Sequence, residues 1–428
     1  MHDGNTPATR PSVAVIGSGV SGLTAAYLLR ETHDVTLLEA DDRLGGHAHT
    51  HQVAAAAGAT MGVDSGFIVH NDRTYPHLRR LFDELGVEVH PTEMSMSIQC
   101  TRTGLEYAGG RGAKGIFAQR RRVADPRFLG LLAQVKRFQV LAGKLLDDPA
   151  GDDTLTYGEF LRQHRFGAYF TSYYAIPVVS CVWSSGHDVA LEYPARYLFE
   201  FLRHHGFLSL GDSPQWFTVV GGSGTYVEKV AAALGDVRRS TGATRVVRDL
   251  DGVTVDDVRG GSQRYDQVVL ATHADDALAL LADPTPDEKR VLGAFEYSHN
   301  ETVLHTDASL LPTAPQARAA WNYRTDGGRR EARTQVTYWM NRLQGLPGDE
   351  QFLVTLNATD RIDPARVVAT MQYTHPIYTP ASVAAQRDLD SLTTGRTAFA
   401  GAYHGWGFHE DGCRSGVRAA AAVGGTRW

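Results

Sequence analysis

Apolar and polar positions at the start of the chain follow two different periods. Short apolar runs, typical of buried strands, flank a stretch whose apolar residues recur at helical spacing. These predicted elements cover residues 12–16, 23–30 and 34–38. Gly17, Gly19 and Gly22 lie between the first strand and the helix, and Glu39 follows the second strand. This order predicts a dinucleotide site, because the glycines let backbone approach a pyrophosphate and the acid accepts ribose hydroxyls.

The same order of strand, glycine-rich turn and helix occurs in two later stretches. A strand leads into residues 221–224, which read GGSG, and a helix follows. A hairpin near 244–255 and a buried strand at 265–271 come next. Near the end, a strand leads into Gly401 and a glycine-rich loop, and a helix begins near Glu410. The turn at 221–224 could begin a second dinucleotide site or return to the first unit. Against a second site, the third glycine of its motif would fall on Val227, whose side chain blocks close helix packing.

Two long stretches lack this order of elements. The first is dense in Tyr, Phe and Trp, and the second has strand-like runs that predict an antiparallel sheet. We predict an α/β fold in which a discontinuous Rossmann-like domain carries a substrate domain of mixed antiparallel sheet plus helices. The nucleotide-binding domain is expected at 1–90, 222–290 and 394–428, and the substrate domain at 91–221 and 291–393.

Composition narrows the classes of function. The chain has 428 residues and a net charge of −6, so no general attraction to nucleic acid follows. Its 3 cysteines are far apart, which indicates neither a disulfide framework nor a cysteine-based zinc site. Residues 1–11 lack the apolar core of a signal peptide, and no apolar run is long enough to span a bilayer. We therefore expect a cytoplasmic protein.

A second glycine motif indicates which dinucleotide binds. Arg43-Leu44-Gly45-Gly46 follows Glu39 closely, and Asp64-Ser65-Gly66-Phe67 comes later. Together with the F-A-G and G-F-H-E sequences near the C-terminus, these motifs resemble the flavin amine oxidase and phytoene desaturase superfamily. The resemblance implies FAD. It also implies that FAD is bound non-covalently, because no cysteine lies in the stretch before Gly401 where some relatives attach it; attachment to His47 or His409 is the alternative.

The resemblance implies a set of residues around FAD, drawn from four segments of the chain. They are Gly17, Gly19, Ser21, Gly22, Glu39, Ala40, Arg43, Gly45, Gly46, His47, Asp64, Ser65, Gly66, Phe67, Val246, Val247, Ala271, Thr272, Gly401, Ala402, His409 and Glu410. His47 stands where the superfamily has an arginine after the two glycines.

Histidines at positions 47, 49 and 51 would share one face of a strand. They suggest either a metal site or a cover over the cofactor. No carboxylate or cysteine completes a ligand set, so we predict the cover and no metal.

Six residues are predicted to be the catalytic residues, at the substrate face of the flavin. They are Tyr338, Trp339, His404, Trp406, Phe408 and Glu410. For the aromatic residues, ordinary core packing is the alternative. For Glu410, the alternative is charge compensation at a helix N-terminus, and the sequence leaves this open.

A basic segment at 119–146 carries apolar residues at helical spacing. Such a helix either docks on the protein by its apolar face or lies on an anionic membrane surface, and the pattern is the same for both.

The expected reaction is hydride transfer from a substrate C–H to flavin N5. The chain resembles bacterial FAD-binding oxidoreductases related to the N-terminal region of plant cyclopropane fatty acid synthases, which implies a lipid acyl substrate. No lysine follows Lys289, although flavin amine oxidases usually carry one in that later region. An oxidase of amines or small natural products is the alternative, and a non-redox isomerase or a flavoprotein that supports a partner is another. The sequence leaves the oligomeric state open.

Overall fold

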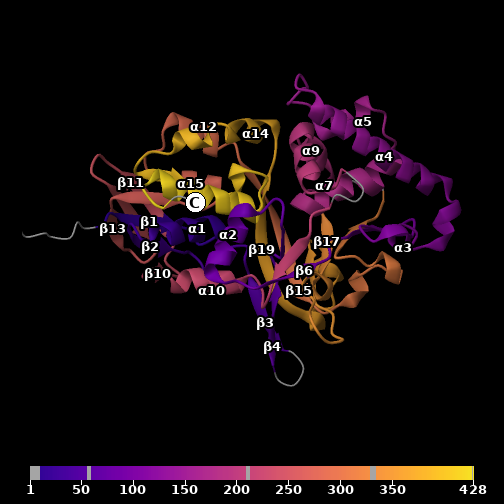
Figure 1. Ribbon diagram of the computed structural model, residues 1–428, viewed down its shortest axis with the longest axis horizontal. Coiled ribbons are helices and arrows are strands. Elements are labelled where there is room, and N and C mark those ends of the chain that lie inside the picture. Colours follow the sequence, from indigo (N-terminus) through magenta and orange to yellow (C-terminus); the bar gives the residue numbers. More distant parts are fainter. Residues whose placement is uncertain (1–9, 55–58, 209–212, 328–333, 427) are drawn as a thin grey trace, which may run out of the picture.

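The computed structural model describes residues 10–54, 59–208, 213–327, 334–426 and 428. Residues 1–9, on which most of the expectation about a signal peptide depends, lie outside this range. Figure 1 shows a parallel sheet with its helices on the left and a group of helices at the upper right.

The N-terminal strand is the centre of a five-stranded parallel sheet. The strands run in the order β10 (Asp236–Arg238), β2 (Asp34–Leu38), β1 (Ser12–Ile16), β14 (Gln267–Leu270) and β20 (Thr397–Phe399). Side chains of β1 alternate between two separate cores, Val13 and Val15 on one face and Ala14 and Ile16 on the other. Burial on both faces explains why this strand is apolar throughout.

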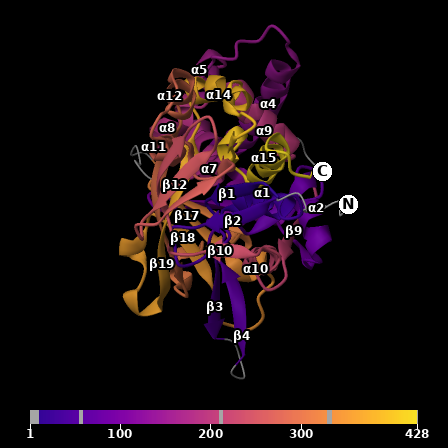
Figure 2. The same cartoon turned by 90° about the vertical axis from the view of Figure 1, so that its left-hand side faces the viewer.

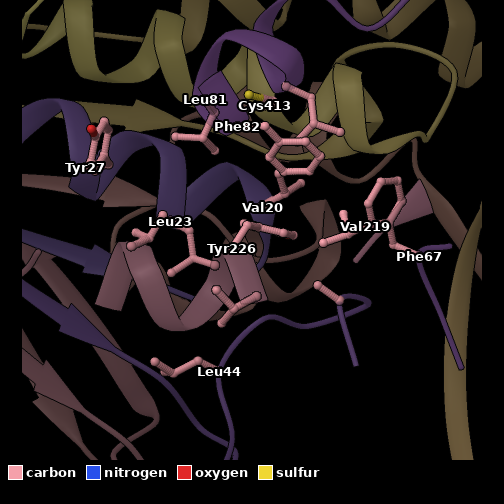
Figure 3. Packing of buried hydrophobic residues seen from close by; sticks show 14 of the residues in the cluster. Val20, Leu23, Tyr27, Leu44, Phe67, Leu81, Phe82, Val219, Tyr226 and Cys413 are labelled. Carbon is pink, nitrogen blue, oxygen red and sulfur yellow. The ribbon is translucent and has the colours of Figure 1, made fainter. Parts of the chain in front are cut away.

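Helices cover one face of this sheet and a small antiparallel sheet covers the other. The helices are α1 (Val20–Leu29), α2 (Pro76–Leu85), α10 (Gly224–Ala232) and α15 (His409–Ala422), and the small sheet is β11 (Ala243–Arg248), β12 (Val253–Asp257) and β13 (Ser262–Tyr265). Figure 3 shows Leu23 of α1, Phe82 of α2, Tyr226 of α10 and Cys413 of α15 in one core. The predicted strand at 265–271 is divided, because β13 ends at Tyr265 and β14 begins at Gln267.

The predicted antiparallel sheet has seven strands. Their order is β19 (Val367–Ile377), β15 (Glu296–His305), β18 (Leu353–Leu356), β17 (Gln335–Trp339), β16 (Trp321–Thr325), β7 (Met96–Cys100) and β8 (Leu105–Gly109). Only the β16–β7 pair is parallel within this sheet. The observed parallel and antiparallel sheets confirm the predicted fold class.

A group of helices packs beside this sheet, and because most of them carry Phe, Tyr or Trp we call them the aromatic helices. They are α3 (Gly112–Ile116), α4 (Pro126–Asp147), α5 (Tyr157–Gln163), α6 (Ala168–Phe170), α7 (Ile176–Trp183), α8 (His187–Glu192) and α9 (Ala195–His204). The predicted basic helix begins later than expected, at Pro126, because Asp125 caps its N-terminus through the N–H groups of Arg127 and Phe128. The arginines at 120–122 lie in a separate 3-10 turn. No helix of the described residues is long and apolar enough to cross a membrane.

Smaller elements connect these parts. Strands β5 (Val69–Asn71), β9 (Trp216–Val219) and β6 (Val89–Thr92) form one sheet, and the remaining helices are α11 (Ala274–Leu280), α12 (Pro286–Leu292), α13 (Met340–Leu343) and α14 (Pro380–Gln386). Strands β3 (Thr50–Ala54) and β4 (Thr60–Asp64) form a hairpin that projects from the body (Figure 2). Only His51 of the three histidines lies on β3, so the expectation of one shared strand face is wrong.

Candidate active site

The first glycine turn is shaped by very close backbone contacts. Gly17 has φ +98°, and a Cβ at this position would lie 2.8 Å from the carbonyl oxygen of Ala271. A Cβ on Gly22 would lie only 1.9 Å from the carbonyl oxygen of Gly17, so α1 can begin here only with glycine. Ala271 and Thr272 follow the carboxyl end of β14, and this places two of the predicted cofactor residues directly against the turn.

Glu39 lies at the carboxyl end of β2, as a ribose acceptor requires. Its Oε2 accepts hydrogen bonds from the N–H (2.9 Å) and the hydroxyl (2.5 Å) of Ser18. Its Oε1 accepts from the N–H of Asp41 at 2.9 Å. Ser18 therefore orients Glu39, a role that the sequence reasoning missed. Ala40 is exposed beside Glu39, with its Cβ 3.0 Å from where a Cβ on Gly242 would lie.

The second glycine turn lies against the first. Gly45 and Gly46 have φ values of +107° and +56°, and a Cβ on Gly46 would lie 3.2 Å from the Cα of Gly19. Gly19 has open space around its own Cβ position, and α1 begins there without a side-chain cap. Arg43 donates to the carbonyl of Gly46 at 2.8 Å, so it also braces its own loop. Free helix N–H groups beside an open glycine turn fit a pyrophosphate.

Asp64 holds the return turn of the chain in place. Its carboxylate accepts bonds from the N–H and hydroxyl of Ser223, from the hydroxyl of Thr50 and from the side-chain amide of Gln344. Burial raises the pKa of Asp64 to about 6, although the bonds from Thr50 and Ser223 oppose this shift. Its bonds to Ser223 hold the turn at 221–224 in place, so Asp64 positions this turn.

Residues after Asp64 pack against two histidines, His47 and His409. A Cβ on Gly66 would lie 2.2 Å from the carbonyl oxygen of His47, so only glycine fits. Phe67 stacks on His409 with ring centroids 3.7 Å apart and an interplanar angle of 12°. His409 also bonds the Tyr226 hydroxyl at 3.1 Å through Nε2, and burial lowers its pKa to about 3.

His47 lies between these turns and the long strand β19. Its ring centroid is 4.9 Å from that of Tyr373 and 5.4 Å from that of His375. Burial lowers the pKa of His47 well below its ordinary value, with His375 as the next cause. Its Nε2 is buried without a partner among the described residues. An unpartnered donor or acceptor beside the glycine turns is consistent with a ligand such as FAD.

Helix α15 packs tightly on α1. A Cβ on Gly416 would lie 2.3 Å from the carbonyl oxygen of Ser21, and one on Gly412 would lie 2.6 Å from the side chain of Val20. Gly401 donates its N–H to the Ser415 hydroxyl at 2.9 Å, and Ala402 follows at the turn before α15. The two helix N-termini are thereby brought together.

Val246 and Val247 lie on β11. Val246 is fully buried, and its carbonyl accepts from the N–H of Ala282 at 2.9 Å, whereas Val247 is half-buried. The described contacts of these two residues are with the core and with neighbouring strands.

Glu410 caps a different helix from the one on which it lies. Its carboxylate accepts bonds from the backbone N–H groups of His77 (3.1 Å) and Leu78 (3.0 Å), in the first turn of α2. The ring Nδ1 of His77 is 2.7 Å from the same carboxylate. The predicted catalytic role of Glu410 does not fit this geometry, because both of its oxygens are occupied by α2. The alternative of charge compensation at a helix N-terminus agrees with it, although the helix is α2 and not α15.

Phe408 and Trp406 join the aromatic helices. Phe408 stacks on Phe201 of α9 with centroids 4.8 Å apart, and Trp183 of α7 donates its indole N–H to the Trp406 carbonyl at 2.9 Å. Tyr338 packs edge-on to Trp321, at 5.4 Å, in a cluster with Cys181. These three predicted residues therefore lie on the aromatic side of the molecule.

Two other predicted residues lie elsewhere. Trp339 follows Tyr338 on β17 and points to the opposite face of the sheet, where its indole N–H bonds Gln351 at 2.8 Å. His404 lies against Tyr403, with Asp390, Arg418 and Arg414 as its charged neighbours, and burial lowers its pKa to about 4. Neither packs on the aromatic helices among the described residues, and Nε2 of His404 is buried without a partner there. Their place in a substrate pocket stays a prediction.

Residues 20–305 match the family of flavin containing amine oxidoreductases. The chain belongs to this family. Membership confirms the predicted FAD cofactor and the predicted class of FAD-dependent oxidoreductase. The glycine turns, Glu39 and the unpartnered His47 nitrogen are the residues that would hold FAD.

Individual relatives match smaller parts of the chain. An L-amino acid dehydrogenase of Synechocystis is 24% identical over 271 residues, which are 60% of this chain and 55% of the relative. The flavin-dependent L-tryptophan oxidase RebO of Lentzea aerocolonigenes is 54% identical over 41 residues, 9% of each chain. The match thus spans about half or less of the length of these curated relatives.

Solved structures share the fold across almost the whole chain. Cyclohexylamine oxidase from Brevibacterium oxydans superposes with a TM-score of 0.69 at 19% identity, covering 97% of this chain and 98% of that one. A fatty acid isomerase from P. acnes that produces CLA has a TM-score of 0.66 at 18% identity, covering 95% and 97%. Identities this low establish the common fold and not a common substrate.

Proposed function

We propose that this flavoenzyme oxidises or desaturates an apolar substrate of the lipid acyl class. The observation that carries the proposal is the position of Trp406 and Phe408. Both lie in the turn that leads into α15 at the predicted flavin site, and both pack into the aromatic helices. Bound FAD supplies hydride acceptance, and the protein orients the substrate and excludes water.

The polar groups near this side are already engaged by protein. Glu410 bonds α2, and Asp64 bonds the return turn. Asp411 accepts the N–H of Phe408 at 3.1 Å and pairs with Arg414 at 2.8 Å. Recognition of an ammonium group needs a desolvated carboxylate or an aromatic cage. None of these three buried carboxylates is free for one, which favours an apolar substrate.

Two alternatives have support from structural relatives. Cyclohexylamine oxidase and putrescine oxidase share the fold and act on amines by name, which supports an oxidase of amines or small natural products. The fatty acid isomerase supports an acyl substrate without net oxidation. The experiment must therefore separate the substrate class from the net redox change.

Anaerobic mixing of the FAD-loaded protein with substrate panels separates these cases. We expect bleaching of the oxidised flavin spectrum with unsaturated acyl phospholipids or fatty acids, and none with primary amines and diamines. Bleaching by amines alone would reverse the ranking. Acyl products that form without accumulation of reduced flavin would favour the isomerase.

A matched pair of variants tests the aromatic side. Phe408→Ala removes a ring that stacks on Phe201, whereas Trp339→Ala removes a ring on the opposite face of β17. We expect acyl turnover to fall at least about tenfold only in the Phe408 variant, because a lost near-attack position costs that much. Equal losses in both variants would argue against a pocket at Phe408.

We also propose a peripheral membrane contact through the outer face of α4. Residues 129, 133, 136, 140 and 144 follow one side of this helix and are exposed or partly exposed. Leu129 and Val140 on this stripe are 43% and 49% exposed. Lys136 lies between these two residues along the helix, and Lys144 lies one turn after Val140. Neither lysine forms an ion pair among the described residues. Exposed apolar side chains flanked by free lysines suit an anionic bilayer surface.

Sedimentation with liposomes tests this contact. We expect binding to phosphatidylserine vesicles that weakens with salt, and little binding to phosphatidylcholine vesicles. Lys136→Glu with Lys144→Glu should abolish it. Lys289→Glu, a single charge reversal at an exposed position of α12, should not. Binding that persists in the α4 double variant, or that never occurs at low salt, removes the membrane contact from the proposal.

A further inference from the structure

A chain of hydrogen bonds connects the predicted flavin region with the protein surface. The Tyr373 hydroxyl on β19 lies 2.7 Å from the Ser65 hydroxyl. The Ser65 hydroxyl lies 2.9 Å from Nε2 of His51 on β3. Nδ1 of His49 lies 3.0 Å from the same Tyr373 hydroxyl. Two of the three histidines that suggested a metal site, His49 and His51, are thus joined through Ser65 and Tyr373.

The two ends of this chain lie in different surroundings. Tyr373 is only 6% exposed, and its ring packs on His47, whose buried Nε2 has no partner among the described residues. Ser65 immediately precedes Gly66 and Phe67, the element expected beside the flavin. His49 and His51 are partly exposed, with ring centroids 4.0 Å apart. At one end the Tyr373 ring therefore packs on a residue that we expect at the cofactor, and at the other end His51 is partly exposed to solvent.

Within the part of the protein that the structure describes, no member of this hydrogen-bonded series is paired with a carboxylate. The charged group with most influence on both histidines is Arg43, and the nearby carboxylate of Asp64 is held by Thr50, Ser223 and Gln344. Burial lowers the pKa of His49 to about 3 and raises that of Tyr373 to about 12; Arg43 also lowers both. The pKa of His51 is lowered by burial first and by Arg43 second. His375, His273 and His409 are the other titratable groups that face His47.

Neutral hydroxyls and imidazoles each carry a donor and an acceptor. A line of such groups passes a proton by exchanging these roles, without any group holding a lasting charge. Carboxylates or ammonium groups in the line would trap the proton instead. Proton transfer requires Tyr373, Ser65 and His51 to be neutral, and this is their state around pH 7.

We propose that Tyr373, Ser65 and His51 form a proton relay between the FAD pocket and solvent, with His49 orienting the Tyr373 hydroxyl. The relay rests on the FAD site of the proposed function. In the outward direction, the Tyr373 oxygen takes up a proton from the pocket and gives its own to Ser65 Oγ. Ser65 gives its hydroxyl proton to His51 Nε2, and His51 releases its Nδ1 proton to water. One proton enters, one leaves, and no electrons move along the chain.

A pH jump on the FAD-loaded protein measures the relay without any substrate. The ring N–H of bound oxidised FAD ionises at alkaline pH and changes its absorbance. We expect this relaxation to slow by about tenfold or more in Ser65→Ala and Tyr373→Phe, with unchanged amplitude, because each breaks the line of transfer. His51→Ala should slow it similarly, and added imidazole should restore the rate.

Controls separate the relay from a structural role. His90→Ala removes a histidine of β6 whose nitrogens lie near the carbonyls of Pro91 and Gln344, and it should leave the rate unchanged. His51→Gln keeps a hydrogen-bonding side chain that cannot relay a proton, so it should bind FAD normally and still be slow. A wild-type rate in His51→Gln, or no rescue of His51→Ala by imidazole, would overturn the relay. Since no substrate is added, such a result leaves the proposed acyl substrate untouched, and a failure of acyl oxidation leaves the relay untouched.

Discussion

The space around glycine Cβ positions differs between the parallel-sheet region and the aromatic helices. At Gly22 a Cβ would lie 1.9 Å from backbone, and at Gly416 it would lie 2.3 Å from backbone. At Gly130 and Gly143 of α4, nothing lies within 4 Å of that position. The first region is built by backbone atoms that nearly touch, and the second by side chains. A side chain is therefore excluded at these glycines of the first region and has room at those of the second.

Two carboxylates, Glu39 and Glu410, show the same difference. Glu39 is held by Ser18, 21 residues away in the same glycine motif. Glu410 is held by α2, 333 residues away. A short motif can specify the first contact. The second depends on two helices that meet only in the folded chain.

The strongest test of this contrast is Gly22→Val. A branched side chain there cannot avoid the carbonyl of Gly17, so we expect loss of FAD binding and of stability by more than about 4 kcal/mol. Flavin content after purification and thermal unfolding measure the two effects. A variant that still carries FAD at wild-type occupancy would contradict the close packing of α1.

Asp64 should give the protein a pH-dependent stability. Its pKa of about 6 in the folded state exceeds its ordinary value of 3.8, so the folded protein keeps a proton that the unfolded chain has lost. Stability should therefore fall as pH rises from about 4 to about 6, by up to about 3 kcal/mol from this residue. Asp411, whose pKa is also raised to about 6, acts in the same direction.

Chemical denaturation across this pH range checks the effect. Asp64→Asn should make the decline shallower without removing it, because Asp411 remains. Asp34→Asn changes an exposed carboxylate on β2 and should leave the decline as in the wild type. An unchanged slope in Asp64→Asn would show that Asp64 keeps an ordinary pKa.

Glu410→Ala should destabilise the protein by about 1–3 kcal/mol, because it leaves two N–H groups of α2 without a partner. If Glu410 acts as a cap, Glu410→Ala should lower the Tm. If Glu410 is a catalytic acid, the isosteric Glu410→Gln should lose most of its turnover and keep nearly all of its stability. Glu31→Gln, an exposed change at the end of α1, is the control for charge. A loss of turnover of a hundredfold or more in Glu410→Gln, with an unchanged Tm, would restore the catalytic role.

The smallest expected effect has the opposite sign. Gly143→Ala places a methyl group in open space within α4, and it should stabilise the protein by about 0.5–1 kcal/mol through helix propensity. Thermal unfolding of Gly143→Ala and Gly22→Val, each measured against the wild type, compares the two regions directly. Destabilisation by Gly143→Ala would mean that α4 is covered by a surface that the described residues do not include.

The sequence by itself determined the nucleotide-binding unit, its glycine turns, Glu39 and the family. Each of these depends on neighbours within a few tens of residues, and backbone geometry restricts which residue types fit. The start of α4 at Pro126 was missed because the cap from Asp125 outweighs the basic pattern before it.

Only the tertiary structure decided what the side chains far from these motifs do. Glu410 caps α2, and Trp339 and His404 lie away from the aromatic helices. His51 is linked to Tyr373 by hydrogen bonds through Ser65. These outcomes depend on contacts across as many as 333 residues, as between His77 and Glu410. No local pattern encodes such a contact, because it exists only once two distant surfaces have packed together.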